Sequence, residues 1–336
     1  MVEEKGKSEI AGTSGLAIEV LPRSINQLNK TALMKAIICT RSGPPDVLEL
    51  REVGKPSPKD NEVLIRVHAA TVTRGDVMLR KLNPLLIVPM RLLGFKRKKI
   101  PGHEFAGEIE TVGKAVTRFK KCDQVFGTTT GLSTGANAEY VCLPEEWRKG
   151  VIGIKPFNMT YGEAAVVPVG GMTALQNLRK ANIQSGQKVL IYGASGSVGT
   201  FAVQIAKYFG AEVTGVCSTS NLELVKSLGA DQVIDYTKQG YTGGSPEYDV
   251  VFDTVGKSTS SLSESYVKKN GHYLSVRSLT NERVEYLSYL KELIEAGKIK
   301  SVIDRSYPLE QVPEAHRYVE QGHKKGNVVI TINQTS

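Results

Sequence analysis

Three glycines separated by two residues each, Gly193, Gly196 and Gly199, form the chemically most informative motif of the chain. They follow a strand-like apolar run, Lys188–Tyr192, and precede an amphipathic helical pattern. Gly193 can make a tight turn, Gly196 lets the backbone approach a pyrophosphate, and Gly199 permits close helix packing. The helix N-terminus adds free N–H groups and a favourable dipole. Although the spacing departs from Gly-x-Gly-x-x-Gly, we expect a dinucleotide phosphate on the whole turn, Gly193-Ala194-Ser195-Gly196-Ser197-Val198-Gly199.

The end of the next strand-like run indicates which dinucleotide binds. Sites selective for NADH usually place a carboxylate there, on the ribose hydroxyls. Here Glu212–Cys217 is followed by Ser218–Asn221, which offers hydroxyl donors and no carboxylate to repel a 2′-phosphate. We therefore expect NADPH. Because no arginine follows this strand either, Lys226 or Tyr236 are the expected sources of further contacts to that phosphate.

The elements that must position these residues change along the chain from β-rich to α/β and back. Short strand-like runs between Ala36 and Val141, separated by Gly and Pro turns, predict a compact β-rich domain. Strands that alternate with helices between Lys188 and Val276 predict a doubly wound parallel sheet. Helix-compatible stretches also cover Tyr161–Asn177, interrupted at Pro168–Gly171, and Asn281–Ala296. We expect an extension at 1–33, a β-rich domain at 34–157 and 300–336, and a nucleotide-binding domain at 158–299.

Composition sets broad limits on the setting of the protein. With 336 residues, 40% hydrophobic, the chain is of ordinary globular composition. It has no apolar run of the ~18 residues that suggest a membrane span, and its charged start has no signal-peptide core. Four scattered cysteines favour reduced thiols in the cytoplasm. The net charge of +9 could attract an anionic cofactor, nucleic acid or a membrane, but we interpret its one local cluster, Arg91–Lys99, as a solvated loop rather than a phosphate- or lipid-facing patch.

Several further motifs join the glycine turn in a family resemblance that covers nearly everything from Met34 to Ile330. The chain resembles the zinc-independent quinone oxidoreductase branch of the medium-chain dehydrogenase/reductase superfamily. The resemblance implies a GroES-like catalytic domain, a Rossmann domain and a nicotinamide cofactor in the cleft between them. The motifs are Gly102-His103-Glu104-Phe105-Ala106-Gly107, Val167–Leu175, Gly193–Gly199, Leu228–Tyr236 and Gly322–Asn327.

The same resemblance implies roles for individual residues. It assigns the adenosine ribose phosphate to Ser218 and Thr219, with Tyr236 packed near it, and Asn221 is a further residue expected to bind the cofactor. Close relatives carry arginine where this chain has Ser220, so the phosphate would be bound less tightly. The residues implied near the nicotinamide, or folding back over the cofactor, are Val169, Thr173, Thr254, Val255, Gly256, Lys325 and Asn327.

The zinc ligands of the metal-dependent relatives are missing at all but one position. Those relatives use Cys, His and a further Cys or Asp, with an open position for substrate. Only His103 survives; Thr73–Asp76 and Val166–Pro168 stand where the other ligands would lie. Because one imidazole cannot hold catalytic zinc, we expect no metal and interpret His103 and Glu104 as structural.

Without a Lewis acid, alcohol oxidation loses its means of stabilising an alkoxide. Hydride transfer to a quinone or an α,β-unsaturated carbonyl needs less help, from hydrogen bonds and a proton. Thr73, Arg74 and Asp76 are candidate groups at the substrate end, although Asp76 could equally cap a helix that runs toward Leu82. We expect an NADPH-dependent reductase of such small molecules.

One departure from the family falls after Val276. The segment Ser275–Thr280 runs almost directly into the Asn281–Ala296 helix, where relatives have a further stretch with cleft residues and an edge strand that pairs subunits. We expect a true deletion to open the cleft and remove the usual dimer seam, which leaves a homodimer in doubt. The short segment also supports an alternative hypothesis, a non-catalytic NADPH-binding protein with a crystallin-like, regulatory or RNA-associated role. Nucleic acid is nevertheless not the expected partner. A zinc alcohol dehydrogenase is a third, weaker alternative.

Overall fold

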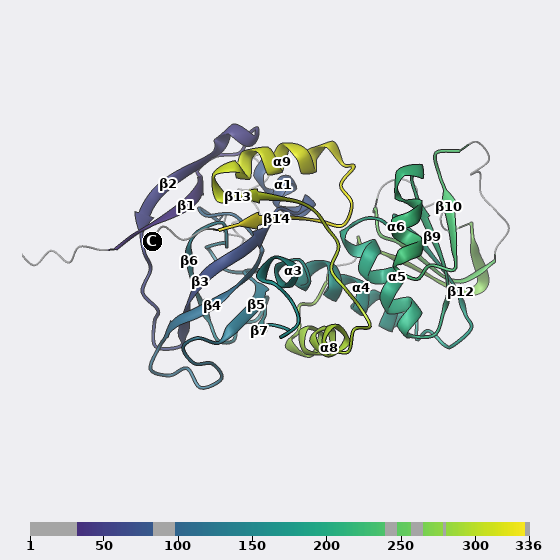
Figure 1. Cartoon of the computed structure of the whole chain (residues 1–336), viewed down its shortest axis with the longest axis horizontal. Coiled ribbons are helices and arrows are strands. Elements are labelled where there is room, and N and C mark those ends of the chain that lie inside the picture. Colours follow the sequence, from purple (N-terminus) through teal and green to yellow (C-terminus); the bar gives the residue numbers. More distant parts are fainter. Residues whose placement is uncertain (1–31, 83–97, 239–246, 257–264, 278–279, 333–336) are drawn as a thin grey trace, which may run out of the picture. The chain divides into compact units, whose positions relative to one another are not determined.

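A computed structural model describes residues 32–82, 98–238, 247–256, 265–277 and 280–332. Within these residues the chain forms two sheets of three or more strands and one two-stranded ribbon (Figure 1). The expected fold class is confirmed: an α/β protein with a parallel Rossmann sheet and a GroES-like β-rich part.

A seven-stranded sheet forms the β-rich part, in the order β13-β14-β3-β4-β5-β7 with β6 paired to β3. The last two strands in the chain, β13 and β14, return to this sheet after the parallel one, as the β-rich tail of the sequence predicts. A separate antiparallel ribbon joins β1 (Leu33–Cys39) to β2 (Leu48–Gly54). The sheet strands are β3 (Glu62–Thr71), β4 (Glu104–Val112), β5 (Gln124–Thr128), β6 (Tyr140–Pro144), β7 (Ile152–Ile154), β13 (Ile303–Pro308) and β14 (Asn327–Thr331).

The second sheet is parallel throughout, in the order β10-β9-β8-β11-β12. Its strands are β8 (Lys188–Tyr192), β9 (Glu212–Cys217), β10 (Gln232–Asp235), β11 (Tyr248–Asp253) and β12 (Val267–Ser275). Counted along the chain this is 3-2-1-4-5, the Rossmann order. The strand order reverses between β8 and β11, so the crevice at their carboxyl ends is the expected ligand site.

Helices pack on these sheets, and two of them, α4 and α5, carry residues expected to bind the cofactor. Helix α5 begins within the glycine turn, at Ser197, and buries Phe201, Ala202 and Ile205, as its apolar pattern predicts. Helix α4 packs against α5. The helices are α1 (Arg74–Lys81), α3 (Tyr161–Ala165), α4 (Pro168–Lys180), α5 (Ser197–Tyr208), α6 (Leu222–Ser227), α8 (Val284–Glu295) and α9 (Val312–Gln321), with 3₁₀ turns η1 (Pro45–Val47), η2 (Thr219–Asn221) and η3 (Leu309–Gln311).

One expected helix interruption is wrong. Pro168–Gly171 forms the first turn of α4, because proline at the first helical position loses no hydrogen bond. Gly170 also lets α4 approach α5 closely: a Cβ on it would lie 3.0 Å from Ser197 Oγ. Helix α3 lies in the expected nucleotide-binding domain, 158–299, but it packs on β3 and β4 of the GroES-like sheet. The domain boundary expected at residue 158 therefore stays a prediction.

Candidate functional site

The glycine turn has the backbone geometry that the sequence predicts. Gly193 has φ +80°, and a Cβ there would meet Val255 Cγ2 at 2.6 Å. A Cβ on Gly199 would lie 2.2 Å from the carbonyl oxygen of Gly193, so α5 packs directly on the turn. Gly196 caps α5 without a side-chain hydrogen bond, and a Cβ on it would meet only Gly193 O, at 3.3 Å. The first-turn N–H groups of α5 thus face an open cradle that fits a phosphate.

Asn221 holds the next part of the cradle together and has spare bonding capacity. Its Nδ2 donates to Ser195 Oγ and to Ser218 Oγ, each at 3.1 Å. Its Oδ1 is buried and has no hydrogen-bond partner among the described residues. A buried acceptor without a partner is costly, so this atom fits a ligand donor such as a ribose hydroxyl.

The segment Lys325–Asn327 folds back onto the turn, as the resemblance implies. Gly326 N donates to Ser195 O at 2.8 Å, and Ser197 Oγ donates to Asn327 Oδ1 at 2.5 Å. Lys325 Nζ reaches Ser220 O at 3.4 Å, which brings a positive charge to the end of β9 where the sequence has no arginine. We call Gly193–Gly199, Ser218–Asn221 and Lys325–Asn327 together the phosphate end of the site.

A carboxylate lies closer to this end than the sequence suggests. Asp235, at the end of the neighbouring strand β10, accepts a 2.6 Å hydrogen bond from Thr219 Oγ1. The sequence analysis considered only the residues that follow β9. Asp235 lies on β10, and the parallel pairing of β10 with β9 places it beside Cys217. Hydrogen bonds from Thr219 and Thr237 hold the pKa of Asp235 below its usual range. Tyr236 is 45% exposed and lies beside Tyr192, with ring centroids 6.5 Å apart.

The residues implied near the nicotinamide come from two parts of the fold, the end of β11 and helix α4. Thr254 Oγ1 donates to Tyr192 O at 2.7 Å, and the N–H groups of Val255 and Gly256 donate to Asp253 Oδ1 at 2.8 and 3.0 Å. On α4, Thr173 Oγ1 and Thr280 Oγ1 are 2.9 Å apart.

Glu104 connects the GroES-like sheet to the start of α4. Its carboxylate accepts from Thr71 Oγ1 and from the N–H of Val169, both at 2.7 Å. Burial raises the pKa of Glu104 to about 7 despite these bonds. Burial also lowers the pKa of nearby Lys324, in the loop before Lys325, to about 8. Glu104 thus positions the helix that carries Val169 and Thr173, in line with the structural role expected of it.

Charged side chains gather at the start of α1. Thr73 and Asp76 form a capping box that starts α1, so the helix expected toward Leu82 is present. Asp76 Oδ2 accepts from Thr73 N at 2.8 Å and from Thr73 Oγ1 at 2.6 Å, while its Oδ1 lies 2.6 Å from His103 Nδ1. Burial opposes ionisation, but His103 and Thr73 hold the pKa of Asp76 below its usual range.

Two further residues here, Lys98 and Glu282, were missed by the sequence reasoning. Glu282 Oε1 accepts from Thr130 at 2.8 Å, and its other oxygen accepts from Thr128. Lys98 Nζ donates to Thr129 O at 2.9 Å, and burial lowers the pKa of its amine to about 8. We call Asp76, His103, Lys98 and Glu282 together the reaction end.

One expectation is corrected. Lys98 is part of a run interpreted as a solvated loop, yet its amine is buried; residues 91–97 of that run lie outside the described residues. The connection after Val276 leads to Glu282, which bonds to Thr128 at the end of β5, and the expected opening of the cleft stays a prediction. Ser278 and Leu279 lie outside the described residues.

The donor set does not fit a catalytic zinc ion. The Thr73 hydroxyl and His103 Nδ1 are both engaged with Asp76, and Val166 and Val167 are fully buried apolar side chains. Among the described residues no group of three or more His, Cys, Asp or Glu side chains could hold a metal. Zinc needs three such protein ligands.

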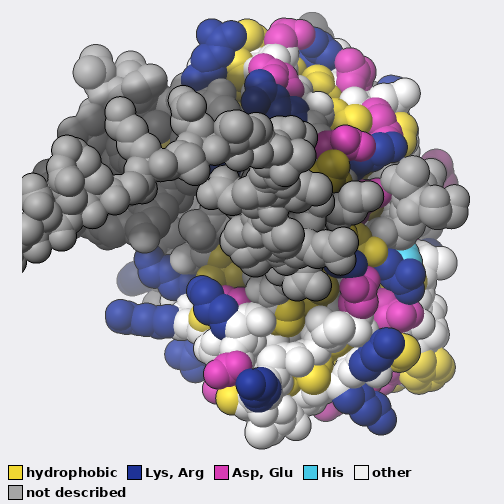
Figure 2. Space-filling view, turned by 90° about the vertical axis from the view of Figure 1, so that its left-hand side faces the viewer, with side chains coloured by type: hydrophobic (Ala, Val, Ile, Leu, Met, Phe, Trp, Pro, Cys, Tyr) yellow, Lys and Arg dark blue, Asp and Glu magenta, His cyan; other side chains and the backbone are white. Residues whose placement is uncertain are grey.

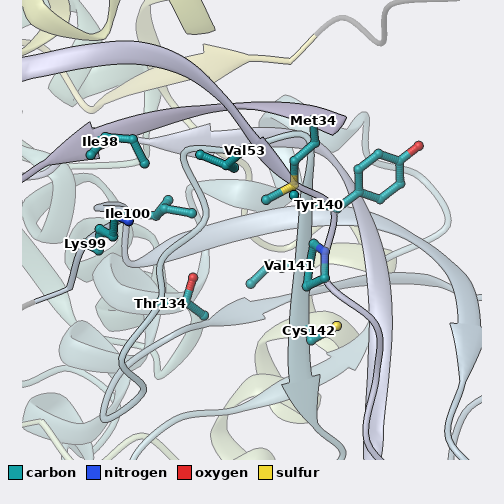
Figure 3. A pocket seen from close by; sticks show the side chains of 11 residues that line it. Met34, Ile38, Val53, Lys99, Ile100, Thr134, Tyr140, Val141 and Cys142 are labelled. Carbon is teal, nitrogen blue, oxygen red and sulfur yellow. The ribbon is translucent and has the colours of Figure 1, made fainter. Parts of the chain in front are cut away.

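A pocket of about 270 Å³ lies elsewhere, beside the β1–β2 ribbon (Figure 3). Its lining is mostly apolar, including Met34, Ile38 and Val53, with Lys99 and Cys142 among the polar groups. It contains none of the residues expected to bind cofactor, and we do not take it as the candidate site.

On the face shown in Figure 2, the basic and acidic side chains of the described residues are interspersed. No helix within the described residues has the length and apolar character needed to cross a bilayer.

Comparison with known proteins agrees with these features. Residues 59–156 match the family model of the alcohol dehydrogenase GroES-like domain, and residues 197–281 and 276–330 match two zinc-binding dehydrogenase models. The chain is 34% identical over 317 residues to 2-methylene-furan-3-one reductase of Solanum lycopersicum, covering 88% of this chain and 79% of that protein. It is 31% identical, with the same coverage, to an Arabidopsis thaliana NADPH-dependent alkenal/one oxidoreductase, chloroplastic.

A solved structure extends the likeness to three dimensions. The quinone oxidoreductase from Coxiella burnetii superposes with a TM-score of 0.80 at 29% identity, covering 90% of this chain and all of that one. The relatives are named as oxidoreductases, several of them NADPH- or NAD(P)H-dependent. The chain is therefore an oxidoreductase with a nicotinamide cofactor, and it belongs to the medium-chain dehydrogenase/reductase superfamily, in its quinone oxidoreductase-like branch.

Proposed function

We propose that the protein is an NADPH-dependent reductase of α,β-unsaturated carbonyl compounds or quinones that works without zinc. The observation that supports this most is the Asp76–His103 pair, which stands where zinc-dependent relatives hold their metal. A hydrogen-bonded acid–base pair can help an activated double bond accept hydride, whereas alcohol oxidation depends on a Lewis acid.

The proposed cofactor is NADPH, held at the phosphate end. The turn Gly193–Gly199 would receive the pyrophosphate, and Ser218 and Lys325 would contact the 2′-phosphate. Asp235 opposes this preference, since its carboxylate bonds Thr219 and would repel the same phosphate. Lys325 is therefore the group on which selectivity depends. When bound, the reduced nicotinamide supplies the hydride.

The residues of the reaction end would orient the substrate and its proton. Thr73 and Asp76 are the candidates from the sequence. They bond to each other within the capping box, and Asp76 also contacts His103, so in this proposal they act through His103. The named activities of the tomato and Arabidopsis relatives support an enone or enal as acceptor, and the Coxiella neighbour supports a quinone.

The test is a substrate panel with NADPH and NADH compared side by side. We expect NADPH consumption with alkenones, alkenals or 1,4-quinones, weaker consumption with NADH, and no loss of rate after treatment with a zinc chelator. Oxidation of simple alcohols that stops on chelation would point to a zinc alcohol dehydrogenase instead.

A second candidate is a protein that binds NADPH without turnover. The observation that favours it is Glu282, whose bonds to Thr128 and Thr130 narrow the reaction end. Tight NADPH binding with no turnover of any panel member would support it, and salt-sensitive RNA retention competed by NADPH would support its RNA-associated form.

Location and assembly stay predictions. We propose a cytoplasmic protein, although several relatives are named as chloroplastic or mitochondrial. We also propose that the family's usual dimer does not form, because β12 is followed after Val276 by the short connection to α8. Size-exclusion chromatography with light scattering tests the second point.

A further inference from the structure

The Asp76–His103 pair has the geometry of a proton donor and its orienting base. Asp76 is 1% exposed and uses both carboxylate oxygens: Oδ2 for Thr73 and Oδ1 for His103 Nδ1, at 2.6 Å. The pKa of Asp76 lies below its usual range, so the carboxylate is ionised and can only accept. His103 Nδ1 must therefore carry the proton between them, which fixes the tautomer and the ring orientation.

The ring edge opposite Asp76 faces outward. The His103 side chain is 21% exposed. Because Nδ1 contacts a buried carboxylate, the exposed part is the edge that holds Nε2. The next residue, Glu104, bonds the first turn of α4, which carries the residues implied near the nicotinamide. Because Nδ1 is engaged with Asp76, Nε2 is the ring nitrogen that remains for a substrate.

Three titratable groups surround the pair: His316 on α9, and Lys98 and Glu282 in connecting segments. His316 on α9 and Asp76 on α1 interact across the buried side, where burial lowers the pKa of His316 to about 4 and keeps it neutral. Lys98 interacts electrostatically with Asp76, and Glu282 interacts with His103.

We propose that His103, oriented by Asp76, delivers the proton that completes reduction of the substrate. This rests on the proposed function, and it replaces the structural role that the sequence favours for His103. His103 is the donor and Asp76 is a positioning residue.

The step balances for an enone. Hydride bonds to the β-carbon while the carbon–carbon π pair moves toward the carbonyl. The N–H bond at His103 Nε2 breaks, its electron pair stays on nitrogen, and the proton bonds to the α-carbon or the carbonyl oxygen. Solvent then returns a proton to the imidazole. A positioned acid of this kind contributes ~10²–10⁴-fold in rate.

Other groups at the reaction end are less suited to the step. The Thr73 hydroxyl already donates to Asp76. The Lys98 amine donates to Thr129 O, so its position is fixed by that bond. Lys98 still serves as the rival donor in the test, because burial lowers its pKa to about 8.

The experiment compares His103→Ala, Asp76→Asn and Lys98→Met with the control His272→Ala, an exposed histidine on β12. For each we would measure NADPH affinity by fluorescence titration, kcat with an enone, and recovery of kcat on adding imidazole. We expect His103→Ala to lose about 100-fold in kcat, to bind NADPH within about threefold of wild type, and to recover at least tenfold with imidazole. Asp76→Asn should lose kcat without recovery, and His272→Ala should match wild type.

A second measurement does not need an active variant. Diethylpyrocarbonate should label His103 in the wild-type protein, and NADPH with a substrate analogue should block that label, while buried His316 stays unlabelled. His103→Ala with kcat within about threefold of wild type, a loss that imidazole does not restore, or a label that bound ligands do not reduce would each overturn the proposal. A larger loss in Lys98→Met than in His103→Ala would transfer the role to Lys98. Wild-type protein that binds NADPH but reduces nothing in the panel would overturn the proposed function itself, and this inference with it.

Discussion

The phosphate end and the reaction end of the site differ in the groups that build them. The phosphate end consists of glycine backbone, small hydroxyl side chains and the start of a helix, and two lysines contact its backbone, Lys325 at Ser220 O and Lys324 at Gly326 O. The reaction end consists of buried or half-buried Asp76, His103, Lys98 and Glu282. Backbone dipoles do not titrate, whereas buried charges do. Changes at the first end should therefore alter cofactor affinity at every pH, and changes at the second should alter turnover and pH dependence.

The largest effect on binding should come from Gly199→Ala. The new Cβ would lie 2.2 Å from Gly193 O and 2.8 Å from Ala194 Cα, both backbone atoms that cannot move cheaply. We expect about 2–3 kcal/mol less stability and about 100-fold weaker NADPH binding. Urea unfolding and NADPH titration measure both. Gly162→Ala in α3, where the Cβ would sit 3.6 Å from Val329, is the control and should change neither. Unchanged NADPH affinity in Gly199→Ala would break the assignment of the phosphate end.

Glu104→Gln tests the residue that joins the two ends. The folded-state pKa of Glu104 is about 7 and its ordinary value is 4.5, so between these pH values the folded state holds more protons and stability falls as pH rises, by up to about 3 kcal/mol. His316, with a pKa of about 4 against an ordinary 6.5, has the opposite sign over nearly the same range. The contributions of these two groups should nearly cancel in the wild type, so its stability should change little between about pH 5 and 6.5. In the Gln variant only the His316 contribution remains, so its free energy of unfolding should increase as the pH rises over this range.

Urea unfolding at several pH values measures this difference. Glu212→Gln, at an exposed position on β9, is the matched control. Parallel pH profiles for Glu104→Gln and wild type would contradict the account of Glu104.

Glu282→Gln should have a moderate effect on the reaction end. An amide has one acceptor oxygen, so one of the two threonine hydroxyls, Thr128 or Thr130, would lose its acceptor. We expect a loss of about 1 kcal/mol in unfolding free energy and NADPH affinity within about twofold of wild type. Glu285→Gln, exposed in the first turn of the following helix α8, is the control. Equal stability of the two variants would show that Glu282 does not hold the crevice together.

The smallest effect is expected from Lys325→Met. Its amine is exposed and reaches Ser220 O at 3.4 Å, so its charge is screened by solvent. We expect NADPH to bind about fivefold more weakly and NADH to bind unchanged. Asp235→Asn should shift the ratio the other way, toward NADPH. Isothermal titration with both cofactors measures the ratio, and an equal loss for NADH and NADPH would remove Lys325 from the 2′-phosphate site.

The two ends also differ in how far the sequence predicts them. Gly193–Gly199 lies within one βα unit, so its spacing alone predicts its geometry. Ser218 and Asn221 follow the next strand of the same pattern. Lys325 was expected over the cofactor only through the family resemblance, because its contact with Ser220 joins residues distant in sequence.

The reaction end was much harder to predict. The Asp76–His103 bond joins the first turn of α1 to the residue before β4, and Glu282 reaches Thr128 from beyond the parallel sheet. No local pattern marks such pairs, since each residue type has an ordinary role at its own position. From the sequence, Asp76 is interpreted as a helix-capping residue, and it does complete the capping box of α1. Lys98 is interpreted as one of a run of surface cations, but its amine is buried.

The most direct test of the account is the transfer of label from NADPH deuterated at C4 of the nicotinamide to an enone, in the presence of a zinc chelator. The account predicts reduced product with one deuterium at the β-carbon, formed at the same rate with and without chelator. An enone recovered unreduced and unlabelled, from protein that still binds NADPH, would contradict it.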